Sequence, residues 1–410
     1  MDIFLRNKNY RKLSVASWLS GAGNILFYLA LMTYASKLKN YSLALSLIAI
    51  MEAIPNLLSS IGGYFADRTK NKYHVIVTLA LIRCALYLVV GLLFASNLAG
   101  WNLVLLVIGL NFISDLAGTY SGGLSTPLIV DLVGQNDLAE AEGFTNGINQ
   151  VITMLAQFIG SGLLLFMSYT NLAIVNAITF LISGLLYLNV GRNYKKQQPI
   201  NTNVNQQSFW ATLKSSYHQV KTAHGLLTIV LVFALLNGIL STIEPLLSIL
   251  VAGNKSMLVG TYSFTIALFG ALDSIGMALG SAIGTKIFKQ TSLFIISLLD
   301  TLASIAMVIA LLTKNMLACL VFGSLLGFFA GVGSPKLSQW LVTSVDHDIL
   351  ASSVGMLNTI LLIAGPLMTT IFTSIAGTTR VNYALYGIIA VSIGVFIVTL
   401  AVMHSAKPKQ

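Results

Sequence analysis

Charged residues are scarce in this chain. They make up 9% of its 410 residues, whereas hydrophobic residues make up 56%, and the mean hydropathy is +0.83. A soluble domain carries about 25% charged residues. Water is therefore excluded as the solvent for most of the folded surface, and the composition indicates an integral membrane protein.

Cysteine is nearly absent, and the motifs of several enzyme classes are missing. Cys84 and Cys319 both lie inside apolar runs, far from any CxxC or Cys/His spacing, which argues against a disulfide framework and a metal site. The sequence has no P-loop, HExxH or GxSxG motif and its five histidines are scattered, which argues against ATP hydrolysis and an intramembrane hydrolase. We therefore expect no enzymatic activity, cofactor or metal.

Long apolar runs, by contrast, are abundant. A membrane-spanning helix needs about 20 apolar residues, and about twelve such runs fit this length. We place them at 14–36, 43–66, 75–96, 101–124, 142–167, 172–190, 226–251, 258–283, 293–312, 316–341, 350–375 and 383–403. The pattern predicts an all-α membrane protein with an N-terminal six-helix bundle at 1–191 and a C-terminal one at 226–410. The polar segment 192–225 is expected to be a linker, with an amphipathic helix on the membrane surface at 209–224.

Lysine and arginine are distributed unevenly between the two sides of these spans. The basic start of the chain resembles a signal peptide, but no small-residue cleavage site follows it, so we expect a retained first helix. If the N-terminus is cytoplasmic, the outside loops carry only a few bases, namely Lys37, Lys39, Lys255, Lys314 and Arg380. The positive-inside rule then predicts cytoplasmic termini. The net charge of +10 follows from this topology, and we expect lipid head groups rather than nucleic acid as its counterpart.

The two halves share an internal repeat at the ends of the fourth and tenth spans. Ser125-Thr-Pro127 is followed by Asp137-Leu-Ala139 and by Gly143-Phe-Thr-Asn146. The same order recurs in Gly333-Ser-Pro335, Asp348-Ile-Leu-Ala351 and Gly355-Met-Leu-Asn358. Parallel repeats of this kind are typical of two-bundle secondary transporters.

A short motif after the second span resembles the signature of a known protein family. Gly63-Tyr-Phe-Ala-Asp67-Arg68-Thr-Lys-Asn-Lys72 resembles the signature G-x-x-x-D-[RK]-x-G-[RK]-[RK] of the major facilitator superfamily. Gly63, Asp67, Arg68 and Lys72 match, whereas Lys70 and Asn71 depart from it. Gly63 permits close helix approach, and Asp67 can accept hydrogen bonds from the start of a neighbouring helix. We assign these four residues to a conformational switch, with a plain basic turn as the alternative.

Over its full length the chain is similar to the branch of that superfamily that contains bacterial macrolide-efflux proteins and siderophore exporters. The Ser/Thr-Pro end of the fourth span, the loop 131–142 and Gly143 support this. Other drug-exporter branches have an Arg in the fourth span and a Gly-Pro pair in the fifth, and this chain has neither. Its Gly-Pro pair is Gly365-Pro366 in the eleventh span.

Acidic residues inside spans are the main functional candidates. A carboxylate at a helix centre costs about 2.5 to 3.5 kcal/mol on insertion scales, so each acid needs a cavity, a partner or a proton. By the resemblance, Asp115 and Glu244 lie on cavity-lining helices, and Glu52 and Asp273 lie where the halves meet. Asp300 is expected to be structural. Protonation of such acids would couple transport to a proton gradient, and replacing Asp115 or Asp273 with Asn is expected to abolish that coupling.

Other polar residues inside spans are candidates for binding or for structure. The polar face of the first span, including Asn24 and Tyr28, would line the cavity or serve helix packing. Arg83 is expected to have a structural role, and Lys336 is a weaker functional candidate.

Together these features predict a monomeric secondary transporter in a bacterial plasma membrane. We expect proton-coupled efflux of a small amphiphilic substrate, with the bundles alternating access to a central site. Membrane acids favour a cationic or neutral substrate. Nutrient import, lysophospholipid flipping and a non-transporting receptor or scaffold are the alternatives, and sodium could replace the proton.

Overall fold

A computed structural model of the chain describes residues 2–134, 137–193, 226–344 and 350–405. All regular elements in these ranges are helices. Packing divides the chain into two compact units. Unit 1 comprises Met1–Lys39 and Leu58–Val204, and unit 2 comprises Asn40–Leu57 and Asn205–Gln410. The predicted surface helix at 209–224 lies outside the described residues.

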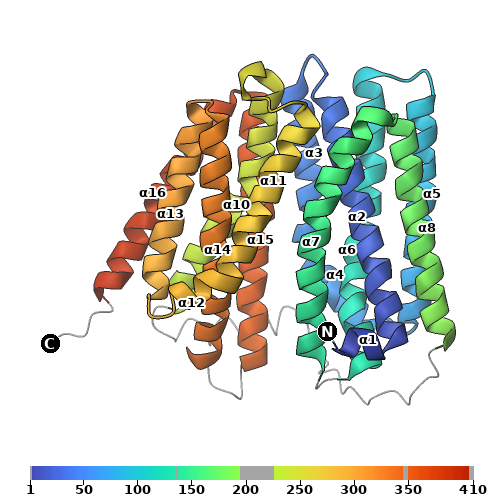
Figure 1. Cartoon of the computed structure of the whole chain (residues 1–410), viewed down its shortest axis with the longest axis horizontal. Helices are drawn as coiled ribbons and strands as arrows, with labels where there is room; N and C mark the ends of the chain where they lie inside the picture. Colours follow the sequence, from blue (N-terminus) through green and yellow to red (C-terminus); the bar gives the residue numbers. More distant parts are fainter. Residues whose placement is uncertain (1, 135–136, 194–225, 345–349, 406–410) are drawn as a thin grey trace. The chain divides into compact units, whose positions relative to one another are not determined.

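Unit 1 is built from helices that run side by side (Figure 1). They are α1 (Asp2–Arg6), α2 (Lys8–Ala35), α4 (Ser59–Arg68), α5 (Lys72–Ala95), α6 (Gly100–Val133), α7 (Leu138–Phe166) and α8 (Tyr169–Asn193). Helix α2 packs against α6, α7 and α8, and α5 packs against α6 and α8.

Unit 2 has the same kind of organisation. Its elements are α3 (Tyr41–Leu57), α10 (Leu226–Gly253), η1 (Lys255–Met257), α11 (Tyr262–Leu279), η2 (Gly280–Gly284), α12 (Thr285–Ile287), α13 (Leu293–Leu312), α14 (Met316–Ser344), α15 (Leu350–Thr378) and α16 (Val381–Ser405). Among the described residues, 11 helices are long and apolar enough to cross a membrane, and α3 is a shorter apolar helix. The predicted all-α membrane fold is confirmed.

The second predicted span is the largest departure from the expected helices. We predicted one helix at 43–66, whereas the structure has α3 and α4, separated at Leu58. Pro55 lies inside α3 and cannot donate a backbone hydrogen bond, which weakens the helix at this point. The two pieces also belong to different units. Within unit 2, α3 packs against α10 and α15, and Ser42 Oγ donates to the Ala376 carbonyl oxygen at 2.8 Å.

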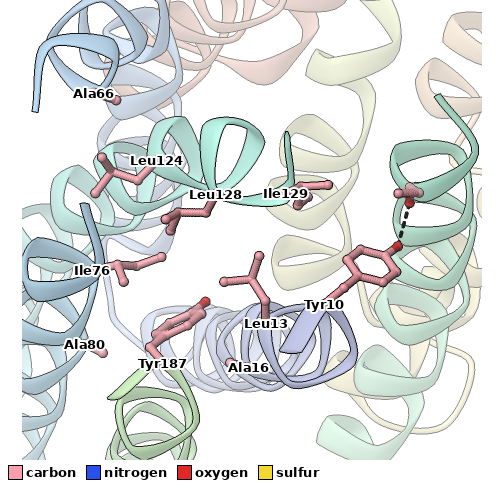
Figure 2. Packing of buried hydrophobic residues seen from close by; sticks show 11 residues of the cluster. Tyr10, Leu13, Ala16, Ala66, Ile76, Ala80, Leu124, Leu128, Ile129 and Tyr187 are labelled. Atoms are coloured by element: carbon pink, nitrogen blue, oxygen red, sulfur yellow. Dashed lines mark hydrogen bonds between the residues drawn. The ribbon is translucent and has the colours of Figure 1, made fainter. Parts of the chain in front are cut away.

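An apolar cluster of buried side chains packs around the start of α2 in unit 1 (Figure 2). Tyr10, Leu13 and Ala16 of α2 are buried there, with Leu124 and Leu128 of α6. The Tyr10 hydroxyl group donates to the Ala141 carbonyl oxygen at 2.7 Å, which ties α2 to α7. Because a buried hydroxyl group needs a hydrogen-bond partner, this contact fixes the register of the two helices.

Unit 2 contains a glycine-lined interface between two helices. Gly276 and Gly280 face the carbonyl oxygens of Ser324 and Phe328, so a Cβ atom at either glycine would overlap with the backbone of α14. Gly327 and Gly331 of α14 approach the backbone of Asp273 and Met277 in the same way. Small residues allow such close approach between membrane helices. The span predicted at 258–283 begins at Tyr262 in the structure and continues into the π-helical turn η2 beside this interface.

Candidate functional site: buried charges in the two units

Arg83 is the centre of a polar network inside unit 1. Its side chain is 4% exposed and comes from α5. Nη1 donates to Ser20 Oγ and Nη2 to Asn24 Oδ1, both at 2.7 Å, while Nε donates to Ser114 Oγ at 3.2 Å. The guanidinium carbon also lies 4.0 Å from the centre of the Phe180 ring, a favourable cation–π geometry. One guanidinium group therefore joins α2, α5, α6 and α8.

Asp115 belongs to the same region of unit 1. It is 8% exposed and follows Ser114, one of the Arg83 partners. Asn111, one helical turn earlier, donates from Nδ2 to Asp115 Oδ2 at 2.6 Å, and the Tyr87 hydroxyl group donates to Asn111 Oδ1. Charged groups this deeply buried require such partners. Of the predicted site residues, Asn24 thus bonds to Arg83, and Asp115 lies in the neighbouring set of hydrogen bonds; the Phe180 ring contacts both Arg83 and Tyr87.

A glycine makes room for this network. A Cβ atom at Gly118 would stand 3.1 Å from Arg83 Cζ, tighter than ordinary packing allows. Gly118 lies one turn after Ser114 on the face of α6 that meets the guanidinium group. Tyr28, also predicted to line the cavity, is half-buried one turn beyond Asn24 on α2.

Unit 2 contains acids of a different character. Glu244 of α10 and Asp300 of α13 both lie close enough to Asp273 of α11 for their charges to repel. Asp300 is 3% exposed. Oδ1 of Asp273 and Oδ1 of Asp300 are buried and have no hydrogen-bond partner among the described residues. These two unpartnered oxygens distinguish unit 2 from the hydrogen-bonded surroundings of Arg83, and we call Glu244, Asp273 and Asp300 the carboxylate group.

Asp273 lies directly against the glycine-lined interface. A Cβ atom at Gly327 would stand 2.6 Å from Asp273 Oδ1. The absence of a side chain at Gly327 therefore provides the space for this carboxylate between α11 and α14. Glu52, the remaining predicted acid, lies half-buried on α3 in unit 2, and its carbonyl oxygen accepts a 3.3 Å hydrogen bond from Asn56 Nδ2.

The motif after the second span forms the end of α4 and the start of α5. A Cβ atom at Gly123 of α6 would lie 3.4 Å from the Gly63 Cα atom, so the two glycines mark a close approach of α4 and α6. Arg68 is exposed, and Lys72 Nζ donates to the Thr69 carbonyl oxygen at 3.0 Å. The Asp67 side chain lies outside the described part of the structure. A switching role for the motif stays a prediction.

Lys336 and Asp300 are the remaining charged residues that the sequence analysis singled out inside the spans. Lys336 donates to the Thr291 carbonyl oxygen at 2.7 Å and to that of Lys289 at 3.3 Å, which is a contact between α14 and the loop before α13. Asp300 was expected to be structural, and that role stays a prediction; its side chain is buried in α13.

These features define the class of protein: it is a helical membrane protein with charged side chains buried inside each of two units. Residues 13–369 match the model of the Major Facilitator Superfamily. The chain belongs to this family of secondary transporters. No protein of curated function matches the sequence.

Solved structures show the same fold at low sequence identity. The nucleoside transporter NupG is 13% identical, with a TM-score of 0.67 over 98% of this chain and 100% of that chain. A POT family transporter in complex with 5-aminolevulinic acid is 12% identical, with a TM-score of 0.69 over 97% and 96%. A bacterial homologue of the human lysosomal transporter Spinster, in an inward-facing and unoccupied conformation, is 14% identical, with a TM-score of 0.63 over 96% and 95%. The predicted major facilitator fold is confirmed.

Proposed function

We propose that this transporter exports amphiphilic compounds of cationic or neutral character across a bacterial plasma membrane and couples their export to protons. The observation that supports this most is the carboxylate group of unit 2. Asp273 lies within charge-repulsion range of both Glu244 and Asp300. Carboxylates buried in a low-dielectric interior need a cation, a hydrogen-bond donor or a proton.

A proton is the simplest occupant for this group. Neighbouring carboxylates in a low-dielectric interior repel one another when all of them are charged, and a proton bound to one of them relieves that repulsion. Movement of the surrounding helices that opens Asp273 to water would release the proton, and re-burial would require its return. This exchange provides the link between a proton gradient and the orientation of the transporter.

Unit 1 has a different part in the proposal. Arg83 is held by Ser20, Asn24 and Ser114, so its positive charge stays fixed within the unit. A cationic substrate is better matched to the carboxylate group of unit 2 than to a region containing a buried guanidinium group. Asn24 and Tyr28 lie half-buried one turn apart on α2, and we place the polar and aromatic contacts of the amphiphile with unit 1 beside them.

Transport by the purified protein in liposomes tests the coupling. The liposome interior is set acidic relative to the bath, and a fluorescent cationic amphiphile such as ethidium is added outside. Antiport predicts that protons leaving the lumen drive dye inward, whichever way the protein is inserted. Dissipating the gradient with a protonophore should stop the accumulation.

The direction of movement separates the alternatives. In liposomes preloaded with dye or nutrient, solute that leaves together with protons would indicate symport and overturn the export proposal. Movement of a labelled lysophospholipid between leaflets would favour the flippase alternative. If dye accumulation responds to a sodium gradient and not to a proton gradient, sodium is the coupling ion instead of the proton.

A further inference from the structure

Helix α7 carries a row of amide side chains in the middle of an apolar span. Asn149, Gln150 and Gln157 are half-buried, and so is Thr153 at the centre of the span Glu140–Phe166. An α-helix turns by about 100° per residue, so these four positions lie within about 100° of its circumference. They form one polar face, which we call the amide face of α7.

The span that carries the amide face is the least enclosed of the described spans. Within its apolar segment 17% of the residues are buried, against 28% to 67% in the others. An amide group inside a membrane needs a neighbouring helix, water or a bound molecule as its hydrogen-bond partner, because lipid tails offer none. The amide face therefore depends on partners from outside its own helix.

The amide face lies at the depth of the polar residues of α2. The two helices are parallel, because Tyr10 at the start of α2 bonds to the start of α7. Further along, a Cβ atom at Gly160 would stand 3.0 Å from Leu26 Cδ2. Gln157 precedes Gly160 by about one turn, and Asn24 precedes Leu26 by two residues. Gln157 and Asn24 are therefore at similar depths in unit 1.

Gln157 has an unmet hydrogen-bond requirement. Its Oε1 atom is buried, and no described residue donates a hydrogen bond to it. The nearest hydroxyl group on the same face is already used, because Thr153 Oγ1 donates to the Asn149 carbonyl oxygen at 2.9 Å. A buried acceptor without a donor is unfavourable. Since the Gln157 side chain as a whole is only half-buried, a turn of its amide group would present the oxygen to a bound molecule.

We infer that the amide face of α7 binds hydroxyl groups on the neutral part of the transported amphiphile. The inference rests on the proposed function in taking that amphiphile as the occupant. A hydroxyl group both donates and accepts hydrogen bonds. It therefore supplies the donor that Gln157 lacks and accepts from the amide groups of Asn149 and Gln150.

Charge argues against a protonated amine, the other donor that such a substrate offers. The four residues of the amide face carry no charge. Asn24, at a similar depth, accepts a hydrogen bond from Arg83 Nη2, so this layer of unit 1 already contains a fixed positive charge. A second cation beside it is disfavoured. A methyl ether, in turn, accepts hydrogen bonds but donates none, so preference for a hydroxyl group over its methyl ether is the signature of the site.

Equilibrium binding tests the inference without any ion gradient. The full-length protein in lipid nanodiscs is titrated with a dansyl-labelled tertiary amine that carries a 2,3-dihydroxypropyl group, and with its 2,3-dimethoxypropyl analogue. Empty nanodiscs give the background. We expect the dihydroxypropyl probe to bind roughly five- to tenfold more tightly, as one or two hydrogen bonds would allow. In Gln150→Leu with Gln157→Leu the two probes should bind with equal affinity.

Matched variants separate binding from helix packing. Gln150→Asn with Gln157→Asn keeps the amide groups and should keep part of the preference. Asn171→Leu removes an exposed amide group from α8 and should leave the preference unchanged. A double leucine variant that unfolds at a lower temperature but still prefers the dihydroxypropyl probe would overturn the inference. Equal affinity of the unaltered protein for the two probes, or binding of neither, would also overturn it.

The inference and the proposed function can fail separately. Gradient-driven accumulation of ethidium by a protein that does not distinguish the two probes would leave the export proposal standing and remove the amide face from it. The opposite result, a preference for the dihydroxypropyl probe without gradient-driven accumulation, would support the amide face as a binding site and overturn the proton coupling.

Discussion

Asn111 Nδ2 donates a hydrogen bond of 2.6 Å to Asp115 Oδ2, one helical turn away on α6. The same Asn111 side chain accepts the Tyr87 hydroxyl group from α5. One amide therefore satisfies a buried acid and a buried phenol together. In unit 1 the buried charged groups of Arg83 and Asp115 have hydrogen bonds, whereas the described part of unit 2 leaves one oxygen each of Asp273 and Asp300 without a hydrogen-bond partner.

Replacing Asn111 with Leu should destabilise the protein. The change removes a hydrogen bond from Asp115 and another from Tyr87, and each buried polar group left unsatisfied costs roughly 1 to 3 kcal/mol. Thermal unfolding in detergent should therefore occur at a lower temperature. Asn102→Leu, at an exposed position on the same helix, is the control and should change the midpoint little. Equal midpoints for both variants would remove Asn111 from the network.

Replacing Arg83 with Lys should restore only part of the stability that Arg83→Ala loses. Lysine keeps the positive charge, but a single ammonium group cannot reproduce the fork of contacts to Ser20, Asn24 and Ser114. The unfolding temperature should be highest with Arg at position 83, lower with Lys and lowest with Ala. If Lys matched Arg, charge alone would account for the role of this residue.

Replacing Asp273 with Asn should abolish gradient-driven dye accumulation in the liposome assay. Asparagine has nearly the same shape as aspartate, but its amide group cannot bind and release a proton during transport. Exchange of dye between two equal pools needs no net proton movement, so it should persist at a rate close to that of the unaltered protein. Full gradient-driven accumulation by the variant would exclude Asp273 from the coupling.

Replacing Gly276 with Ala should separate α11 from α14. The added Cβ would overlap with the Ser324 carbonyl oxygen, and overpacking a membrane interface costs typically about 1 to 3 kcal/mol. Gly394→Ala in α16 is the matched control, because nothing lies within 4 Å of a Cβ atom built there. Unfolding in detergent should be affected by the first change and not by the second.

Much of the fold follows from the sequence because hydrophobic length alone defines membrane helices. The predicted helix at 293–312 matches α13 residue for residue. The break at Leu58 was not predicted, although Pro55 was visible, since prolines are tolerated in the middle of many membrane helices. The helix at 14–36 was placed too late, because Lys8, Arg11 and Lys12 fall inside α2 and charge was taken to mark the helix start.

The candidate site was harder to predict than the helices. Asp115, Glu244 and Asp273 stood out because acids in apolar runs are costly wherever they lie. Their environments depend on which helices face each other, and no spacing within one helix contains that information. Arg83 was expected to be structural from its position near one end of a span, and its three hydrogen bonds and the Phe180 ring come from other helices, which the sequence around Arg83 does not specify.

The membership of α3 in unit 2 affects how the chain can fold as it leaves the ribosome. Residues 41–57 are synthesised early, yet the helices that cover Ala44, Leu45 and Ile48 belong to the C-terminal half, and α15 is completed only near the end. Contacts between such distant residues form late and slowly. A nascent chain that stops before residue 226 therefore leaves this segment without its packing surface, exposed to chaperones and proteases of the insertion machinery.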